Sequence, residues 1–170
     1  HSVLQLPGPG AGIGLIYGPA ISFSCLAAYG IVGTRWAAFV GSLGAALIWL
    51  FPSSQGLPAP HFLLPALGVV LVGSVMQLLL CGAPPGMRKL IISAVLGSLT
   101  FLVYYWLAVF PQLGALPAFS QRRWVSGESF PVLLLVAVGA GAVFGGLLPI
   151  ALLKALGLWK APVRKTEQAK

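Results

Sequence analysis

Long apolar segments without a single Asp, Glu, Lys or Arg dominate this chain. Four of them are long enough to cross a bilayer: Ala11 to Gly33, His61 to Cys81, Leu90 to Phe110 and Val132 to Leu153. A hydrocarbon core of about 30 Å needs roughly 20 apolar residues in a helix, because lipid offers no partner for an unpaired backbone amide. We therefore expect an all-α integral membrane protein.

A fifth apolar segment, Trp36 to Phe51, is only about 16 residues long, or roughly 24 Å of helix. It crosses if it stands upright or if the bilayer thins locally, and a re-entrant segment is the alternative. Proline and glycine breaks separate the segments. The pattern predicts a bundle of about five transmembrane helices in one domain over residues 1–153, followed by a basic tail over residues 154–170.

The positive charges are distributed unevenly between the two sides of this arrangement. Of the ten Lys and Arg residues, only Arg122 and Arg123 fall on one side. The others fall on the opposite side, at Arg35, Arg88, Lys89, Lys154, Lys160, Arg164, Lys165 and Lys170. Because positive loops and tails mark the cytoplasmic side, the N-terminus is expected outside and the C-terminus in the cytoplasm.

The chain has a net charge of +8, and five of its ten cations lie in the last 17 residues, behind the last apolar segment. A basic tail in that place is typical of anchoring to anionic lipid headgroups. We therefore expect lipid as the partner of the tail, and we do not expect nucleic acid.

Small residues recur on one face of the first and last segments. Gly10, Gly14 and Gly18 are four residues apart, and so are Gly141 and Gly145. Helices in lipid associate through close approach of such residues. These helix-packing faces serve either packing within the bundle or docking of another subunit.

Groups suited to catalysis or metal binding are scarce. The chain contains two carboxylates, Glu128 and Glu167, so paired-carboxylate catalysis inside the membrane is not expected. An intramembrane enzyme acting on lipid would depend on Glu128 or His61. On the predicted outer side, His1 and His61 offer a weak ligand set for copper or nickel. The sequence identifies no cofactor.

Few polar side chains are placed to hold a ligand. Gln77 is the most polar residue of its segment, and Ser74 lies three residues earlier on the same helix face. Arg122 and Arg123 are placed to receive an anionic headgroup or substrate. His61 lies at the mouth of the segment that contains Gln77. Alternatively, Gln77 and Ser74 hydrogen-bond between helices.

Two functions follow from these patterns. The first expectation is a non-catalytic integral membrane subunit of a larger complex, with other membrane subunits as partners. The alternative is a transporter or membrane substrate-binding subunit for a small molecule, with an outward-opening cavity near Pro19, Gln77 and His61. In size and hydropathy the chain resembles the membrane substrate-binding subunits of vitamin and metal importers, and no residue carries over from that resemblance.

Overall fold

The computed structural model describes residues 9–34, 36–49, 63–81, 85–109 and 130–161. Within these ranges the chain is helical and contains no strand. The elements are α1 (Pro9–Val32), α2 (Ala37–Trp49), α3 (Leu63–Leu80), α4 (Met87–Tyr104), the π-helical η2 (Tyr105–Val109), α7 (Phe130–Ala140), the π-helical η4 (Gly141–Leu147) and α8 (Leu148–Ala155).

Four of the described helices are long and apolar enough to cross a membrane: Leu15–Val32, Leu63–Leu80, Met87–Tyr104 and Val132–Ala155. They indicate a helical membrane protein, as the sequence predicts. The helix α2 has 13 residues, or about 20 Å, and is shorter than these four. A fifth crossing and the topology of the whole bundle therefore stay predictions.

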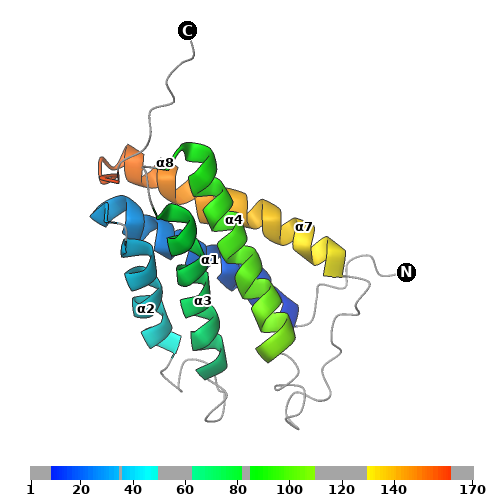
Figure 1. Cartoon of the computed structure of the whole chain (residues 1–170). Coiled ribbons are helices and arrows are strands. Elements are labelled where there is room, and N and C mark those ends of the chain that lie inside the picture. Colours follow the sequence, from blue (N-terminus) through cyan, green and yellow to red (C-terminus); the bar gives the residue numbers. More distant parts are fainter. Residues whose placement is uncertain (1–8, 35, 50–62, 82–84, 110–129, 162–170) are drawn as a thin grey trace.

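The helix α1 occupies the centre of the bundle and contacts every other described element. On one side of α1, α2 and α3 pack next to each other (Figure 1). On the other side, α7, η4 and α8 form one continuous rod, and α4 packs between α3 and this rod.

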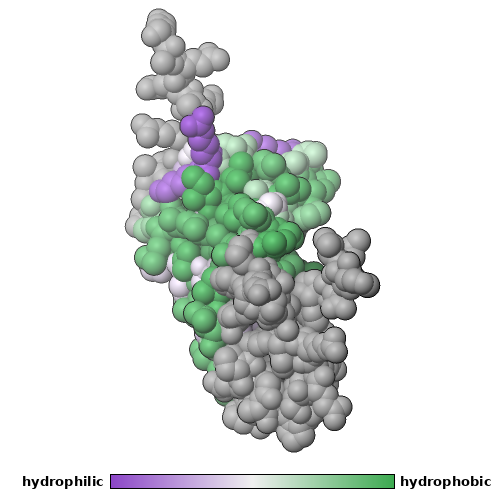
Figure 2. Space-filling model, turned by 90° about the vertical axis from the view of Figure 1, so that its right-hand side faces the viewer, coloured by the Kyte–Doolittle hydropathy of each residue, from purple (hydrophilic) through white to green (hydrophobic). Residues whose placement is uncertain are grey.

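On the face that Figure 2 shows, the coloured surface is mostly apolar, apart from hydrophilic residues near its upper end. Leu78 is 77% exposed and Leu135 is 73% exposed. Helices that are apolar on all sides are typical of membrane spans. Because lipid is as apolar as the bundle interior, apolar burial alone does not hold such helices together, and close contacts of small and polar residues contribute as well.

The rod formed by α7, η4 and α8 passes through Pro149 without ending there. Pro149 has no N–H to donate to the carbonyl four residues earlier. The wider turns of η4 directly precede this proline, which lies in the first turn of α8. The irregular turns thus fall where the proline interrupts the regular helical bonding.

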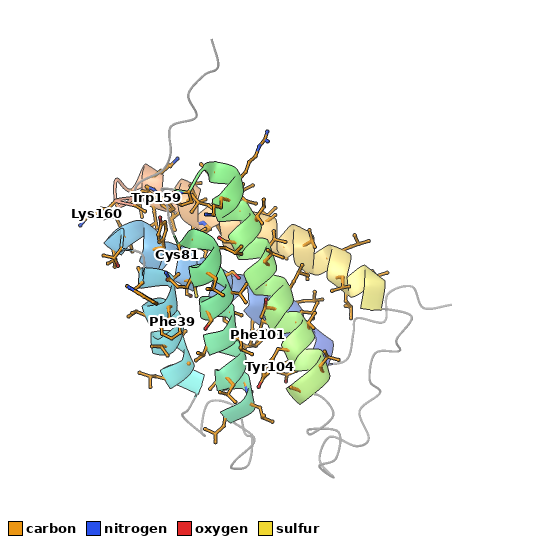
Figure 3. All side chains as sticks on the ribbon, in the orientation of Figure 1. Phe39, Cys81, Phe101, Tyr104, Trp159 and Lys160 are labelled. Carbon is orange, nitrogen blue, oxygen red and sulfur yellow. The ribbon has the colours of Figure 1, made fainter. Side chains whose placement is uncertain are left out.

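One end of the bundle carries all the charged residues that the described ranges contain. Arg88 and Lys89 lie in the first turn of α4, and Lys154 lies in the last turn of α8. Lys160 follows α8 and is labelled in Figure 3. The ends of α1, α3 and α8 meet the starts of α2 and α4 here. We call this the cationic end. Which side of the membrane it faces stays a prediction.

Residues 157–161, which we call the return segment, fold back from α8 to the end of α1. Gly157 has a φ of 67° and ends α8 in the left-handed conformation that favours glycine. The N–H groups of Lys160 and Ala161 then donate to the carbonyl of Gly30 at 2.7 and 3.0 Å. Residues 154–161, which begin the predicted basic tail, are helical or pack against α1 here. Residues 162–170 lie outside the described ranges, and the cytoplasmic tail stays a prediction.

Candidate functional site

Gln77 lies in the last turn of α3, near the cationic end. Gly73, one turn earlier on the same face, packs closely against α2: Ser42 occupies the place of its missing side chain, and Ala38 O is 3.4 Å from that position. Because α2 and α3 run in opposite directions (Figure 1), one turn further along α3 corresponds to one turn earlier in α2. Gln77 therefore lies on the α3 face toward the first turn of α2.

The amide of Gln77 is buried without a hydrogen bond. The residue is 6% exposed, and neither its Nε2 nor its Oε1 has a partner in the structure. An unsatisfied buried polar group costs about 1–3 kcal/mol. An apolar side chain would avoid that cost, so the presence of an amide here calls for an explanation such as a bound water or ligand.

The hydroxyl groups near Gln77 bond to their own helices. Ser74 Oγ donates to Val70 O at 2.9 Å, and Ser42 Oγ donates to Phe39 O at 2.7 Å. Ser74 was expected to share a site with Gln77, and the structure does not join the two side chains by a hydrogen bond. Gln77 is thus the one member of this pair whose bonding capacity is unused.

A second pair of buried polar side chains lies where α1, α4 and η4 cross. Ser98 Oγ donates to Ala94 O at 2.8 Å and shares a hydrogen bond of 3.1 Å with Ser22 Oγ. Both serines are 0% exposed. We call this contact the serine crossing. Its hydroxyl groups are satisfied within the protein, so it has the character of a packing contact.

Three of the expected packing glycines line the serine crossing. A Cβ added at Gly18 would lie 2.8 Å from Ser98 O, and one added at Gly141 would lie 2.9 Å from Ser98 Oγ. Gly145 approaches Ser22 Cβ in the same way, at 3.1 Å. These glycines therefore face other helices of this chain and do not present an open docking surface.

The other candidate residues lie where the structure gives no surroundings. His1, His61, Arg122 and Arg123 are outside the described ranges, and Gly10 and Gly14 belong to the first turns of α1 without described neighbours. Within the described residues, no group of three or more His, Cys, Asp and Glu residues is placed to hold a metal ion. The predicted outer ligand site and the weak metal site stay predictions.

An aromatic contact between α3 and α4 was not anticipated from the sequence. A Cβ added at Gly68 would lie 2.7 Å from the Tyr104 ring and 3.2 Å from the Phe101 ring. Phe101 also packs on Tyr105, with ring centroids 5.9 Å apart. Phe101 and Tyr104 lie on the part of α4 away from the cationic end (Figure 3). Gly68 was the available signal, and a glycine alone does not identify the ring that covers it.

Comparisons with protein families, with curated protein sequences and with solved structures gave no match. No relative therefore supplies an activity, a ligand or a partner for this chain.

Proposed function

We propose that this chain is an integral membrane protein that binds a small polar molecule at Gln77, as a transporter or a membrane substrate-binding subunit. The observation that supports this most is the buried amide of Gln77, whose two polar atoms have no partner. A polar group at such a position in a membrane bundle is a default candidate for a functional site.

The chemistry of the site favours a neutral ligand. A glutamine amide offers both N–H donors and a carbonyl acceptor, so a molecule with a matching amide or hydroxyl group satisfies both atoms. The helices α2 and α3, which border Gln77, contain no ionisable Asp, Glu, Lys, Arg or His. A charged ligand would therefore lack a compensating group from either helix.

The position of Gln77 changes the expected route of entry. An outward-opening cavity near Pro19, Gln77 and His61 was expected from the sequence. Gln77 lies one turn from the cationic end, and the carbonyl of Pro19 faces Gly145 of η4 instead. We therefore place the entrance at the cationic end, which the charge pattern predicts to be cytoplasmic.

Thermal unfolding of the purified protein in mild detergent tests this function. Neutral amides and polyols such as nicotinamide, acetamide and glycerol serve as the first probes. A compound that binds only the folded state stabilises it by about 2.7 kcal/mol at 100 times its Kd. We expect Gln77→Leu to abolish the shift in melting temperature.

The matched control for that experiment is Thr100→Val, which removes another polar group from a membrane helix. The Thr100 hydroxyl donates to Leu96 O of its own helix at 2.7 Å, far along α4 from the cationic end. The control should keep the ligand-induced shift. A shift that persists in Gln77→Leu would place the binding site elsewhere.

We also propose, as the second candidate, a non-catalytic subunit of a larger membrane complex. The observation in its favour is the outer face of α2, where Val40 and Leu47 are each 61% exposed and Gly44 has no atom within 4 Å of its missing side chain. A helix of another subunit can approach closely over such a glycine. Copurification from native membranes at fixed stoichiometry, with Gly44→Cys crosslinking to a partner, tests this; a stable monomer without crosslinks contradicts it.

Catalysis is not included in either proposal. Glu128 and His61, on which an intramembrane lipid enzyme would depend, lie outside the described ranges. The expectation that the chain is not an enzyme stays a prediction.

A further inference from the structure

We propose that the return segment and Lys154 form a fixed binding surface for the headgroups of anionic phospholipids at the cationic end. This site is separate from Gln77 and goes beyond the proposed ligand binding. Figure 3 shows Trp159 and Lys160 beside the end of α1. The surface is therefore part of the folded bundle.

The return segment is held in place by its backbone. Leu158 N–H donates to Leu153 O at 2.8 Å, and the N–H groups of Lys160 and Ala161 both donate to Gly30 O. The indole Nε1 of Trp159 donates to Ala161 O at 3.0 Å. A short segment with its donors bonded in this way presents its side chains in a defined arrangement.

Gly30 is the position on which this arrangement depends. A Cβ added there would lie 2.6 Å from Cε3 of the Trp159 ring and 3.0 Å from a methyl carbon of Leu153. The absence of a side chain at Gly30 thus lets the indole pack on α1. A larger residue at this position would displace Trp159 and the return segment with it.

The side chains that this end exposes combine apolar and positive groups. Leu156 is 60% exposed, Leu158 is 44% exposed and Trp36, at the start of α2, is 61% exposed. Lys154 and Lys160 are exposed among them, and Figure 2 shows hydrophilic residues of this end next to apolar surface. Apolar and tryptophan side chains with lysines are the composition of segments that lie in the headgroup layer.

The charge at this end has one sign. Arg88 and Lys89 add to the two lysines, and the described ranges contain no carboxylate to neutralise them. Each Lys or Arg close to an anionic leaflet strengthens association about fivefold. A soluble anion would interact only with the positive charges, whereas a phospholipid would also bury the exposed side chains of Leu156 and Leu158. The combination favours the lipid.

Titration of the full chain in detergent with lipid, followed by native mass spectrometry, tests the proposal. The two lipids are phosphatidylglycerol, which is anionic, and phosphatidylcholine, which is not. We expect preferential binding of phosphatidylglycerol that weakens as salt increases. The double variant Lys154→Gln/Lys160→Gln should lose about 30-fold in affinity for phosphatidylglycerol, with phosphatidylcholine binding unchanged.

A second variant separates the folded surface from charge alone. Gly30→Leu keeps every cation but displaces Trp159, and it should lower phosphatidylglycerol affinity severalfold. The matched control is Gly139→Leu in α7, because no atom lies within 4 Å of that missing side chain. The control should bind phosphatidylglycerol with the same affinity as the unmodified chain.

Three results would overturn the proposal. Unchanged phosphatidylglycerol preference in the double lysine variant would assign the effect to other cations, including those of residues 162–170. Equal loss in Gly30→Leu and Gly139→Leu would show no role for the return segment. Displacement of phosphatidylglycerol by inorganic phosphate at the same concentration would identify a simple anion site.

Discussion

Two of the places where the described helices bury polar side chains differ in how their hydrogen bonds are satisfied. In the serine crossing, the hydroxyls of Ser22 and Ser98 bond to each other and to a carbonyl of α4. Between α2 and α3, both amide atoms of Gln77 are unpaired. The first region is closed within the protein, and the second has bonding capacity to spare.

The difference follows from the reach of the side chains. A serine hydroxyl in a helix can donate to a backbone carbonyl of the preceding turn, so its hydrogen bond does not depend on a neighbouring helix. The longer glutamine amide has two donors and an acceptor and needs partners from another element. The buried serines are therefore accounted for by close packing, and the unpaired amide of Gln77 is the reason for proposing a site there. Three experiments can break or sharpen this contrast.

The largest effect is expected at the serine crossing from Gly18→Ala. The added Cβ would lie 2.8 Å from Ser98 O, a backbone atom that cannot move without shifting α4. Such overpacking should destabilise the protein by about 3 kcal/mol, measured by unfolding in mixed micelles. The control Gly139→Ala, at a position with open space, should stay within about 0.5 kcal/mol of the unmodified chain. Equal effects at both positions would contradict the close approach of α1 and α4.

A smaller effect of opposite sign is expected from Gln77→Leu in the absence of ligand. Leucine has a similar size but no polar group, so replacing the unpaired amide by it should stabilise the protein by about 1 kcal/mol. The same unfolding measurement applies, with Thr100→Val as the control. A marked loss of stability in Gln77→Leu would show that the amide already has a partner and would remove the reason for placing a site there.

The smallest effect concerns the contact between the two serines. A double-mutant cycle with Ser22→Ala and Ser98→Ala should give a coupling of about 0.6 kcal/mol, which is typical of hydrogen bonds between membrane helices. The coupling is small because Ser98 keeps its hydrogen bond to Ala94 O when Ser22 is changed. A coupling above about 2 kcal/mol would mean that the serine crossing does more than hold the helices together.

Helix positions followed closely from the sequence because the bilayer imposes a length and a hydropathy on each span. The predicted segment 61–81 corresponds to α3, and the segment 132–153 corresponds to the rod of α7, η4 and α8. The predicted segment 90–110 corresponds to α4 and η2, although α4 begins earlier, at Met87. Charged Arg88 and Lys89 were excluded from the predicted span, yet a helix can continue into the headgroup layer where such side chains reach water.

The candidate site was only half predictable. The sequence identified Gln77 as a polar residue inside a span, since no other residue there has an amide. Whether a partner meets that amide depends on which helix lies opposite, and periodicity carries no such information. The same applies to Gly30 and Trp159, whose contact joins residues far apart in the chain.

The sequence by itself determined that the chain is helical and suited to lipid, because long segments without charge can satisfy their backbone groups only in helices. It also determined where positive charge accumulates along the chain. Only the tertiary structure decided that Gly18, Gly141 and Gly145 pack against Ser22 and Ser98. It also decided that Gln77 is left without a partner and that Trp159 packs on Gly30. The physical reason is that hydropathy acts on each segment separately, whereas these contacts depend on the relative placement of two or three helices.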